Sequence, residues 1–473
     1  MPTVADYPQL QIIRDLAKRQ KRQVYLVGGF LRNQKLGLST ALDFDFAVDR
    51  DALKLARSFA RAVKGAFVLL DKEHGSARVV KSYEGRPWTF DFTDFRGKDI
   101  RQDLARRDFT VNTFCFDLAD EKDCSPPQAL KDLKACTIRM VSAKAFTDDP
   151  LRLMRAFSLA AQTGFKIEAP TNRRIQSHIH LINRAAMERI REEFFKILQS
   201  PRAYTTLAAM HKIGLLEKII PQIAVMFGVK QGGYHHLDVW KHTLDMVRQL
   251  EDILPKLEQK SQLHTYLNEE TGGGHSCRAL LKLAALLHDI GKPETRKKEA
   301  TRMTFHGHEH AGQRITRLVA KRLMLSVKER YFLEDVVRMH LRPGYLANFK
   351  RPTTKALFRY FRDTKEKAPA IAVLAMADQR ATAGPLTTAA KARHHEKICQ
   401  LIIEEYFKEA AKPQRLRLLS GHDLIKTLKL KPSPLFAEIL GKVEEAQALG
   451  KVSTKDQALN LARSLCVSTN SKK

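Results

Sequence analysis

Two short stretches near the start of the chain decide its fold: VYLVGGFLRN, at Val24–Asn33, and LDFDFAV, at Leu42–Val48. Both are rich in aliphatic and aromatic residues, which is typical of a strand, and the first runs into a double glycine and an expected helix. Because side chains alternate between the two faces of a strand, Asp43 and Asp45 should point one way while the phenylalanines beside them point into a core. The pattern therefore predicts two carboxylates that converge on one face of a sheet.

These residue types suit the transfer of a nucleotide. Paired acids can hold Mg²⁺ ions that bridge an attacking hydroxyl and a departing pyrophosphate in an in-line displacement. Gly28 and Gly29 let the backbone approach phosphate oxygens, and Arg32 can offer forked donors to a triphosphate. Each motif also has an ordinary explanation, since an edge strand with one polar face can read DxD and a double glycine is commonly only a turn. Their succession in one short segment favours the catalytic interpretation.

Strand, double glycine, arginine and DxD in this order resemble the opening of the polymerase-beta-like nucleotidyltransferases. Further motifs make the chain similar to the bacterial tRNA CCA-adding enzymes and poly(A) polymerases, because they follow in the order of that family: ARRDFTVN (Ala105–Asn112), DDPLRLMRA (Asp148–Ala156), TGF (Thr163–Phe165) and ERIREEF (Glu188–Phe194). The resemblance covers roughly Val24 to Leu198. It implies an enzyme that adds nucleotides to the 3′ end of RNA, with tRNA as the expected substrate.

The resemblance also implies roles for individual residues. Arg107 and Asp108 would hold the phosphates and ribose of the incoming nucleotide, while Asp149 and Arg152 would present a protein template to the edge of its base. A carboxylate can accept from the exocyclic amine of C or A and a guanidinium can donate to a ring acceptor, whereas U and G present mismatched groups. Arg155 shares a helix face with Arg152 and can reach a nearby phosphate. The DDP segment is also the pattern of a capped helix start, and both interpretations can hold together.

Several positions depart from the pattern of the family or leave alternatives open. Asn33 stands where the family usually has an aspartate after the double glycine, and Ser158 stands where the neck helix usually has a further arginine. Asp91, in WTFDFTDF, is either a third carboxylate beside the DxD pair or a surface-facing side chain. Only the short stretch GKDIRQDLA, at Gly97–Ala105, stands where CCA-adding members carry a longer flexible loop. In this family a shortened loop resembles the enzymes that add only the two cytidines.

Farther along the chain, histidines and aspartates recur within VWKHTLDMV, LAALLHDIGKP, FHGHEHAG, VVRMHLRP and AMADQRA. This order resembles the HD metal-dependent phosphohydrolase domain, over about Gly233 to Tyr406. Neutral imidazoles and carboxylates suit a divalent transition metal, and adjacent His288 and Asp289 at a bend in an apolar helix can present both heads to one ion. The resemblance implies a first-metal set of His242, His288, Asp289 and Asp378, with His308 and His340 at positions that hold a second ion in some members. Such a domain can be catalytic or vestigial and structural.

The overall composition limits the class of protein. Lysine and arginine number 82 against 52 aspartates and glutamates, and the resulting formal charge of +30 favours a polyanionic partner such as nucleic acid, although a generally basic soluble protein would show the same balance. No apolar stretch approaches the roughly 20 residues of a membrane span, and no secretory signal opens the chain, so we expect a cytoplasmic protein with no membrane partner. The cysteines form no CxxC pair and are expected to be reduced bystanders: Cys115, Cys124, Cys136, Cys277, Cys399 and Cys466.

The expected fold is an α/β N-terminal nucleotidyltransferase domain of the polymerase-beta-like type, followed by all-α neck, HD and C-terminal helical regions. Short β-rich runs alternate with helical stretches up to about Val141, whereas apolar residues at helical spacing dominate after Asp149. The predicted boundaries are 1–145 for the head domain, 146–225 for a neck that selects the base and binds RNA, 226–410 for the HD domain and 411–473 for a helical segment and tail.

In the predicted reaction, the 3′-hydroxyl of the RNA attacks the α-phosphate of CTP or ATP, with Mg²⁺ held by Asp43 and Asp45 and with Asp91 as a candidate third catalytic carboxylate. Whether CCA, CC, A or poly(A) is added stays open at this point. One alternative is a poly(A) polymerase that uses the same residues. A binding-only protein is another, but it would have no need of an intact DxD, double glycine and RRD. A last alternative makes the HD phosphohydrolase the principal activity and leaves the front half to capture RNA.

Overall fold

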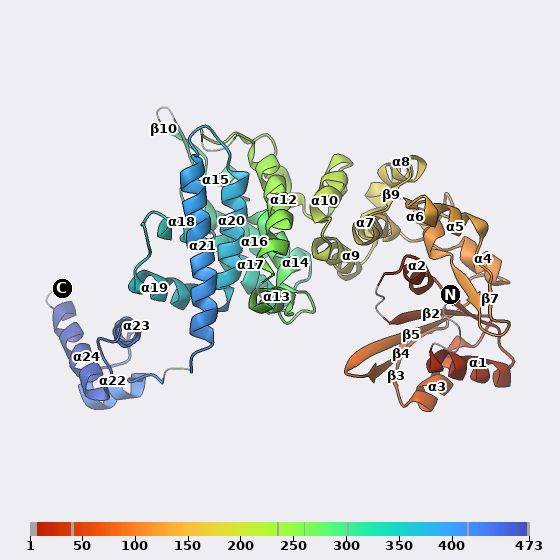
Figure 1. The fold of residues 1–473 in the computed structure, drawn as a ribbon, viewed down its shortest axis with the longest axis horizontal. Coiled ribbons are helices and arrows are strands. Elements are labelled where there is room, and N and C mark those ends of the chain that lie inside the picture. Colours follow the sequence, from red (N-terminus) through yellow and green to blue (C-terminus); the bar gives the residue numbers. More distant parts are fainter. Residues whose placement is uncertain are drawn as a thin grey trace. The chain divides into compact units, whose positions relative to one another are not determined.

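The computed structural model describes residues 7–38, 42–233, 236–259, 261–299, 302–413 and 416–470. The chain forms two compact units, Met1–Ile219 and Ile220–Lys473. The first is a mixed α/β unit and the second is almost entirely helical, as the sequence predicts (Figure 1). Within the described ranges, no helix combines the length and the apolar character that crossing a bilayer would require.

A seven-stranded sheet organises the first unit, with the strand order β3-β4-β5-β2-β1-β6-β7. The β2 and β5 strands are parallel, and all other neighbours are antiparallel. The strands that form it are β1 (Val24–Val27), β2 (Asp43–Val48), β3 (Ala66–Asp71), β4 (Ser76–Tyr83), β5 (Arg86–Asp94), β6 (Cys115–Asp117) and β7 (Lys122–Asp123). The four stretches in which the sequence predicts strands lie in β1, β2, β4 and β5.

One face of this sheet is a hydrophobic core. The rings of Phe44 and Phe90 stack with their centroids 5.2 Å apart, and those of Phe46 and Phe92 stack at 4.9 Å. All four are buried beneath helices α1 (Pro8–Gln20) and α3 (Ala52–Val63). Because side chains alternate along β2, this packing forces the two aspartates of the strand onto the opposite, open face.

The remaining helices of the first unit either connect strands of the sheet or follow its last strand in the sequence. Helix α7 packs against α9 and α10 and begins at Arg152, one of the two predicted template residues, while Asp149 lies just before it. Strands β8 (Thr137–Ile138) and β9 (Lys166–Ile167) form a small parallel pair. The helices are α2 (Gly29–Lys35), α4 (Ile100–Ala105), α5 (Pro127–Lys134), α6 (Ala145–Asp148), α7 (Arg152–Thr163), α8 (Ala169–His178), α9 (Met187–Gln199), α10 (Ala203–Lys212) and α11 (Leu215–Ile219).

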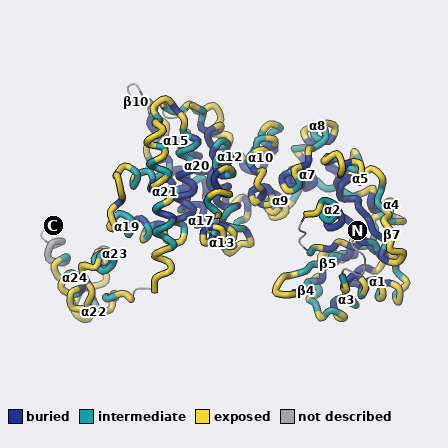
Figure 2. The backbone as a smooth tube through the Cα atoms, viewed as in Figure 1, coloured by how far each residue is buried: buried dark blue, intermediate teal, exposed yellow. Residues whose placement is uncertain are grey.

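The second unit is built around two helices that are apolar on nearly all sides, α14 and α20, and that lie buried among the others (Figure 2). A helix without a polar face must be covered by protein, which explains their central position. The helices are α12 (Val239–Leu257), α13 (Ser261–Asn268), α14 (Cys277–Leu287), α15 (Lys292–Thr295), α16 (His308–Arg322), α17 (Val327–Met339), α18 (Arg342–Leu346), α19 (Thr354–Thr364), α20 (Ala368–Ala381) and α21 (Ala389–Ala410), with a hairpin of β10 (Lys297–Glu299) and β11 (Arg302–Thr304).

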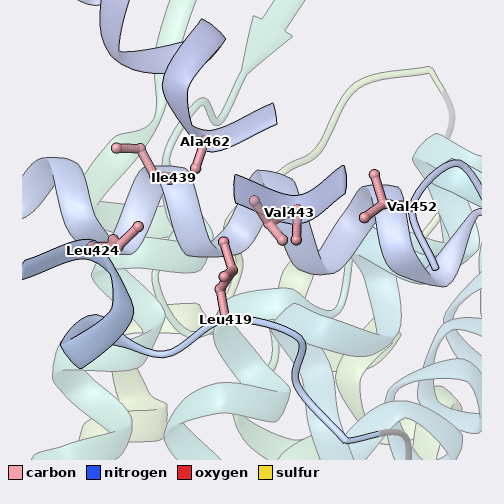
Figure 3. Packing of buried hydrophobic residues seen from close by; sticks show 7 residues of the cluster. Leu419, Leu424, Ile439, Val443, Val452 and Ala462 are labelled. Atoms are coloured by element: carbon pink, nitrogen blue, oxygen red, sulfur yellow. The ribbon is translucent and has the colours of Figure 1, made fainter. Parts of the chain in front are cut away.

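Three helices form the last part of the described chain: α22 (Gly421–Leu428), α23 (Pro434–Ala448) and α24 (Lys455–Asn470). They share a small core of their own around Leu424 and Ile439 (Figure 3). Glu445 on α23 accepts two hydrogen bonds from Arg359 on α19, at 2.6 and 3.1 Å. Since the core is small, this ion pair helps to fix the segment against the rest of the second unit.

Candidate functional site

The open face of the sheet carries three neighbouring carboxylates. In the parallel pairing of β2 with β5, Asp45 lies directly opposite Asp91, and Asp43 lies opposite Thr89, which donates a hydrogen bond to it. Asp43 and Asp45 are exposed to solvent. Asp91 is held by Arg78, whose Nε and Nη2 each donate to one carboxylate oxygen at 2.7 Å. The open face thus presents an all-oxygen donor set of the kind that Mg²⁺ prefers.

Gly28, the first residue of the double-glycine turn, lies close to these carboxylates. Its φ of 88° lies in the region that only glycine adopts at no steric cost. A Cβ at this position would lie 3.2 Å from Asp45 Oδ2 and 3.3 Å from Arg107 Nη1. The missing side chain therefore keeps open the space between the DxD strand and Arg107.

A chain of hydrogen bonds links the α2 arginine to the RRD motif. The buried Arg32 donates from Nη1 to the side-chain oxygen of Asn112, whose amide donates in turn to Asp108 at 3.0 Å. The other side of the guanidinium donates to Asn33 Oδ1 at 3.0 and 2.7 Å, so this asparagine supplies the acceptor that the expected aspartate would supply. Burial lowers the pKa of Arg32 to about 10, so the group stays charged at neutral pH.

Asp108 and Arg155 form a partly buried ion pair, with Arg155 Nε donating to Asp108 Oδ2 at 2.8 Å. Burial by itself would raise the pKa of Asp108, but the charge of Arg155 and hydrogen bonds from Asn112, Arg155 and the Phe109 amide outweigh it and bring the pKa to about 2. Asp108 therefore remains an acceptor across the physiological range. Arg155 keeps 40% of its side chain exposed and can still reach a ligand.

The predicted template residues are anchored on both sides. Arg152 donates to the backbone carbonyl oxygens of Arg106 at 2.7 Å and Arg107 at 3.3 Å. Asp149 accepts from the Leu151 amide at 3.1 Å, just before α7 begins, and from Arg189 at 3.2 Å. The DDP segment thus both supports the start of a helix and positions a carboxylate.

A cavity of about 330 Å³ brings most of the predicted residues together. The predicted residues in its wall are Asp45, Asp91, Arg107, Asp108, Asp149, Arg152 and Arg155. Gly28 borders Asp45, whereas Asp43 and Arg32 lie beside the cavity rather than in its wall. Four further residues for which the sequence predicts no role also lie in its wall: Arg96, Asp103, Arg106 and Arg189. Arg106 and Arg189 belong to the RRD and ERIREEF motifs, whereas Arg96 and the acidic Asp103 lie outside both, and the positions of all four around one cavity depend on packing.

The second departure from the family pattern is also compensated. Ser158 is buried on α7 and donates a hydrogen bond to Glu193 on α9. That carboxylate also faces Lys196 at 2.8 Å and Arg155 at 3.8 Å. A serine therefore fits here because cations already surround its partner.

The predicted metal ligands lie close together, at or near the ends of helices of the second unit. His242 lies in the first turn of α12 and His308 begins α16, whereas His288 and His340 terminate α14 and α17. Asp289 follows α14 directly, and Asp378 lies near the end of α20. Asp289 is shared by two groups in which the ligand atoms all lie within 4.8 Å of one another: His242, His288 and Asp289, and Asp289, His308 and His340.

His288, His308 and His340 are oriented in the same way. Three ring Nδ1 atoms lie at hydrogen-bond distance from a carbonyl oxygen of the preceding turn: His288 from Ala285 at 2.8 Å, His308 from Phe305 at 2.8 Å and His340 from Val337 at 2.7 Å. A proton on Nδ1 leaves Nε2 as an acceptor, which is the usual arrangement of a metal-bound histidine. The pKa of His340 is lowered to about 3 by burial, with the charges of His308 and His288 adding to it, so its ring stays neutral.

The acceptor atoms face one another at short range. His288 Nε2 is 3.1 Å from Asp289 Oδ2, and His308 Nε2 is 3.3 Å from His340 Nε2. Asp378 Oδ1 completes the first group, 3.0 Å from His242 Nε2. Lone pairs that face one another in a buried site repel, and a divalent cation between them removes the repulsion. The donor set therefore fits one ion in each group, although Lys292, 2.6 Å from Asp289 Oδ2, already supplies one positive charge.

The geometry defines a class of protein: a polymerase-type nucleotidyltransferase unit joined to a unit with an HD-type metal cluster. Three family descriptions match in the same order, the Poly A polymerase head domain at residues 24–139, the probable RNA and SrmB- binding site of polymerase A at 164–227 and the HD domain at 239–419. The chain belongs to the class II tRNA nucleotidyltransferase and poly(A) polymerase family, and it is a tRNA nucleotidyltransferase with an HD domain.

Individual relatives support this assignment. The chain is 30% identical over 441 residues to the A-adding tRNA nucleotidyltransferase of Deinococcus radiodurans, covering 92% of this chain and 93% of that protein. It is 31% identical over 446 residues to the CC-adding tRNA nucleotidyltransferase of Thermus thermophilus, covering 92% of each. The Thermotoga maritima CCA-adding enzyme complexed with tRNA shares its fold, with a TM-score of 0.61 and 19% identity over 97% of this chain and 95% of that one.

Proposed function

We propose that this tRNA nucleotidyltransferase adds cytidines to the 3′ end of tRNA and adds the terminal adenosine poorly. The observation that supports this specificity is the connection between β5 and the RRD motif. Asp99 caps helix α4 by accepting from the Gln102 amide at 2.9 Å, and Asp103 accepts from the Arg96 amide at 3.1 Å. The connection is thus a tight turn followed by a capped helix.

A rigid connection bears on base selection because of where α4 leads. The carbonyl oxygens that anchor Arg152 belong to Arg106 and Arg107, directly after α4. To accept A after two cytidines, the template must move relative to the bound base, and a flexible loop beside the active site can drive such a change. Here the segment that would act as the lever is fixed by its own hydrogen bonds, so the template stays in one state.

That state suits cytosine. Arg152 uses two of its five N–H donors on carbonyl oxygens, and the others can donate to the ring acceptors of the base. Asp149 keeps lone pairs that can accept from the exocyclic amine of cytosine. Uracil offers a carbonyl oxygen in place of that amine and is rejected because two acceptors would then face each other.

The chemical step follows from the groups around the cavity. The 3′-hydroxyl of the tRNA attacks the α-phosphate of CTP, a new P–O bond forms and the bond to pyrophosphate breaks. Asp43 and Asp45, with Asp91 beside them, would hold Mg²⁺, which when bound supplies charge for the entering and leaving oxygens. Arg107 and Arg155 lie in the same cavity and neutralise the triphosphate, while Arg32 orders the RRD segment through Asn112.

The specificity is tested with labelled tRNAs that end at the discriminator base, at C or at CC, each incubated with CTP, ATP or both. A product that stops at CC when both nucleotides are present supports the proposal. A complete CCA end made at a comparable rate would contradict it. Activity only on tRNA that already ends in CC would make the enzyme A-adding, as the Deinococcus radiodurans relative is named.

The role of the carboxylates is tested separately with Asp43→Ala and Asp45→Ala. Both variants should lose nucleotide addition and keep tRNA affinity, because binding to the RNA backbone rests mainly on lysine and arginine. Asp120→Ala, at an exposed position outside the cavity, is the matched control. Near-normal incorporation by either site variant would overturn the two-metal assignment.

We further propose that the HD cluster hydrolyses phosphate esters with a divalent transition metal. The supporting observation is a cavity of about 900 Å³ into which Asp289, His308, His340 and Asp378 open, with the cationic Lys292 and Lys391 in its wall. The probes are p-nitrophenyl phosphate and its bis-ester, after loading with Mn²⁺, Co²⁺ or Ni²⁺. Hydrolysis lost in His288→Ala supports catalysis, whereas a metal-loaded protein without hydrolysis of either probe has a structural HD domain.

A further inference from the structure

A row of cross-strand neighbours crosses the sheet of the first unit and passes through the candidate catalytic carboxylates. Asp91 lies opposite Asp45, Asp45 opposite Val27, and Val27 opposite Cys115. Residues directly opposite each other in a sheet point to the same face, and neighbouring strands lie about 4.8 Å apart. Cys115 is therefore on the face of the carboxylates, two strands or roughly 10 Å from Asp45.

The row of opposed residues ends at a second cysteine, Cys124. Strands β6 and β7 pair Phe116 with Asp123 and Asp117 with Lys122, so the next pair in register is Cys115 with Cys124. The Cys124 amide donates to the Cys115 carbonyl oxygen at 3.0 Å, which continues the ladder to this pair. The spacing of these cysteines in the sequence shows no motif, and only the hairpin brings them together.

The two thiols differ in access to solvent. Cys115 is buried, with 1% of its surface exposed, and Cys124 is exposed. A hydrogen bond with the Cys124 thiol, together with burial, raises the pKa of Cys115. Cβ atoms of directly opposed residues lie about 4.5–5.5 Å apart, and a disulfide needs about 3.5–4.5 Å, so a small local shift can join the sulfurs.

We propose that Cys115 and Cys124 are a reversible oxidation site, and that the disulfide between them weakens binding of the incoming nucleotide. The exposed Cys124 thiolate attacks hydrogen peroxide, forming an S–O bond and breaking the O–O bond, and the released hydroxide takes up a proton to become water. The Cys115 sulfur then attacks the sulfenic acid, the S–S bond forms, the S–O bond breaks and a second water leaves. The two thiols lose two electrons and two protons, and the peroxide gains them.

The disulfide would act on the nucleotide site through β6. Cys115 packs in a small core with Val27, Ala47 and Leu104, which joins β1, β2 and α4. The residue before it, Phe114, accepts from the Gly28 amide at 2.9 Å. A shift of Cys115 toward β7 would therefore displace Phe114 and, through this hydrogen bond, the turn at Gly28. That turn borders the space between Asp45 and Arg107, where a displacement of a few tenths of an ångström would create or remove a contact.

The experiment exposes the full-length reduced protein to hydrogen peroxide, removes the oxidant and measures KM for CTP and the affinity for tRNA. We expect KM to rise at least fivefold with tRNA affinity unchanged, and dithiothreitol to restore the original KM. Trypsin cleaves after Lys122, between the cysteines, so mass spectrometry should find two peptides linked through Cys115 and Cys124.

Two variants separate this site from general oxidation. Cys136→Ser removes an exposed cysteine outside the pair and should respond as the wild type does. Cys124→Ser should keep its KM after peroxide treatment, and because Cys124 is exposed this variant should fold normally. The proposal is overturned if the linked peptides do not form, if they form without a change in KM, or if Cys124→Ser is inhibited to the same extent as the wild type.

Discussion

Exchange of Asp149 for asparagine offers the sharpest test of how the base is selected. In the structure Asp149 Oδ1 accepts from the Leu151 amide at 3.1 Å and Oδ2 accepts from Arg189 at 3.2 Å. Asparagine keeps one oxygen, which can continue to accept from Leu151, and replaces the other by an amide that donates. The backbone contact is preserved while the hydrogen-bonding character toward the base is reversed.

The size of the effect follows from the hydrogen bonds that change. A carboxylate oxygen complements the N4 amine of cytosine, whereas an amide N–H complements the O4 of uracil. One good pairing of this kind discriminates by about 1–3 kcal/mol. Since 1.4 kcal/mol corresponds to a factor of ten, the preference for CTP over UTP in kcat/KM should fall roughly 5-fold to 150-fold.

The assay measures the first addition to a tRNA that ends at the discriminator base, with CTP and UTP supplied in separate reactions. Asp120→Asn makes the same chemical change at an exposed position outside the cavity and should leave the preference unaltered. An unchanged ratio of kcat/KM in Asp149→Asn would refute the template. An equal loss with both nucleotides would also refute it, because it would show that the Asp149 carboxylate supports the reaction without discriminating between the bases.

Three further predictions concern charge, metal and stability. The affinity for tRNA should fall steeply as salt increases, since a formal charge of +30 implies release of counterions from the RNA; a flat titration would mean that the charge serves another purpose. The purified protein should carry a divalent metal that is lost in the His288→Ala, Asp289→Ala double variant, as elemental analysis of both proteins would show, and equal metal content would exclude this ligand set. Arg155→Ala should lower the midpoint of thermal unfolding at pH 7, because the buried Asp108 carboxylate loses a charged partner. The cost is about 1.5 kcal/mol after allowing for the exposure of Arg155. Arg155→Lys, which keeps the positive charge, is the comparison, and an unchanged midpoint in Arg155→Ala would contradict the prediction.

Local pattern was enough to predict the elements that carry the chemistry. The alternation in LDFDFAV predicts buried phenylalanines and outward aspartates, and the structure confirms both because the side-chain period of a strand admits no other arrangement once one face is covered. Motif order predicted the mixed α/β unit followed by helices and the HD cluster, and these predictions are confirmed as well. The predicted roles of individual transferase residues remain predictions, although the cavity brings most of them together.

What the sequence did not predict depends on contacts between distant elements. The pairing of Arg189 with Asp149 joins α9 to the segment before α7, and the bond from Arg78 to Asp91 depends on the register of β4 against β5. The cysteines were expected to be bystanders because no CxxC spacing is present, yet the β6–β7 register places Cys115 opposite Cys124. The length of the turn between β6 and β7 does not by itself determine the register of the two strands, so the opposition of Cys115 and Cys124 is seen only in the folded sheet.

In both candidate sites, backbone carbonyl oxygens orient the side chains that would contact a ligand. A group that must act on a ligand needs one part held rigidly and another part left free, and backbone carbonyl oxygens do the holding. Carbonyl oxygens fix the Nη atoms of Arg152, leaving the donors that we propose for a base, and they fix Nδ1 of His288 and His340, leaving Nε2 for the proposed metal. Because these anchors are main-chain atoms, no single side-chain exchange removes them. A substitution of one anchored residue therefore leaves the carbonyl anchors of its neighbours in place, and the remaining groups of each site keep their orientation.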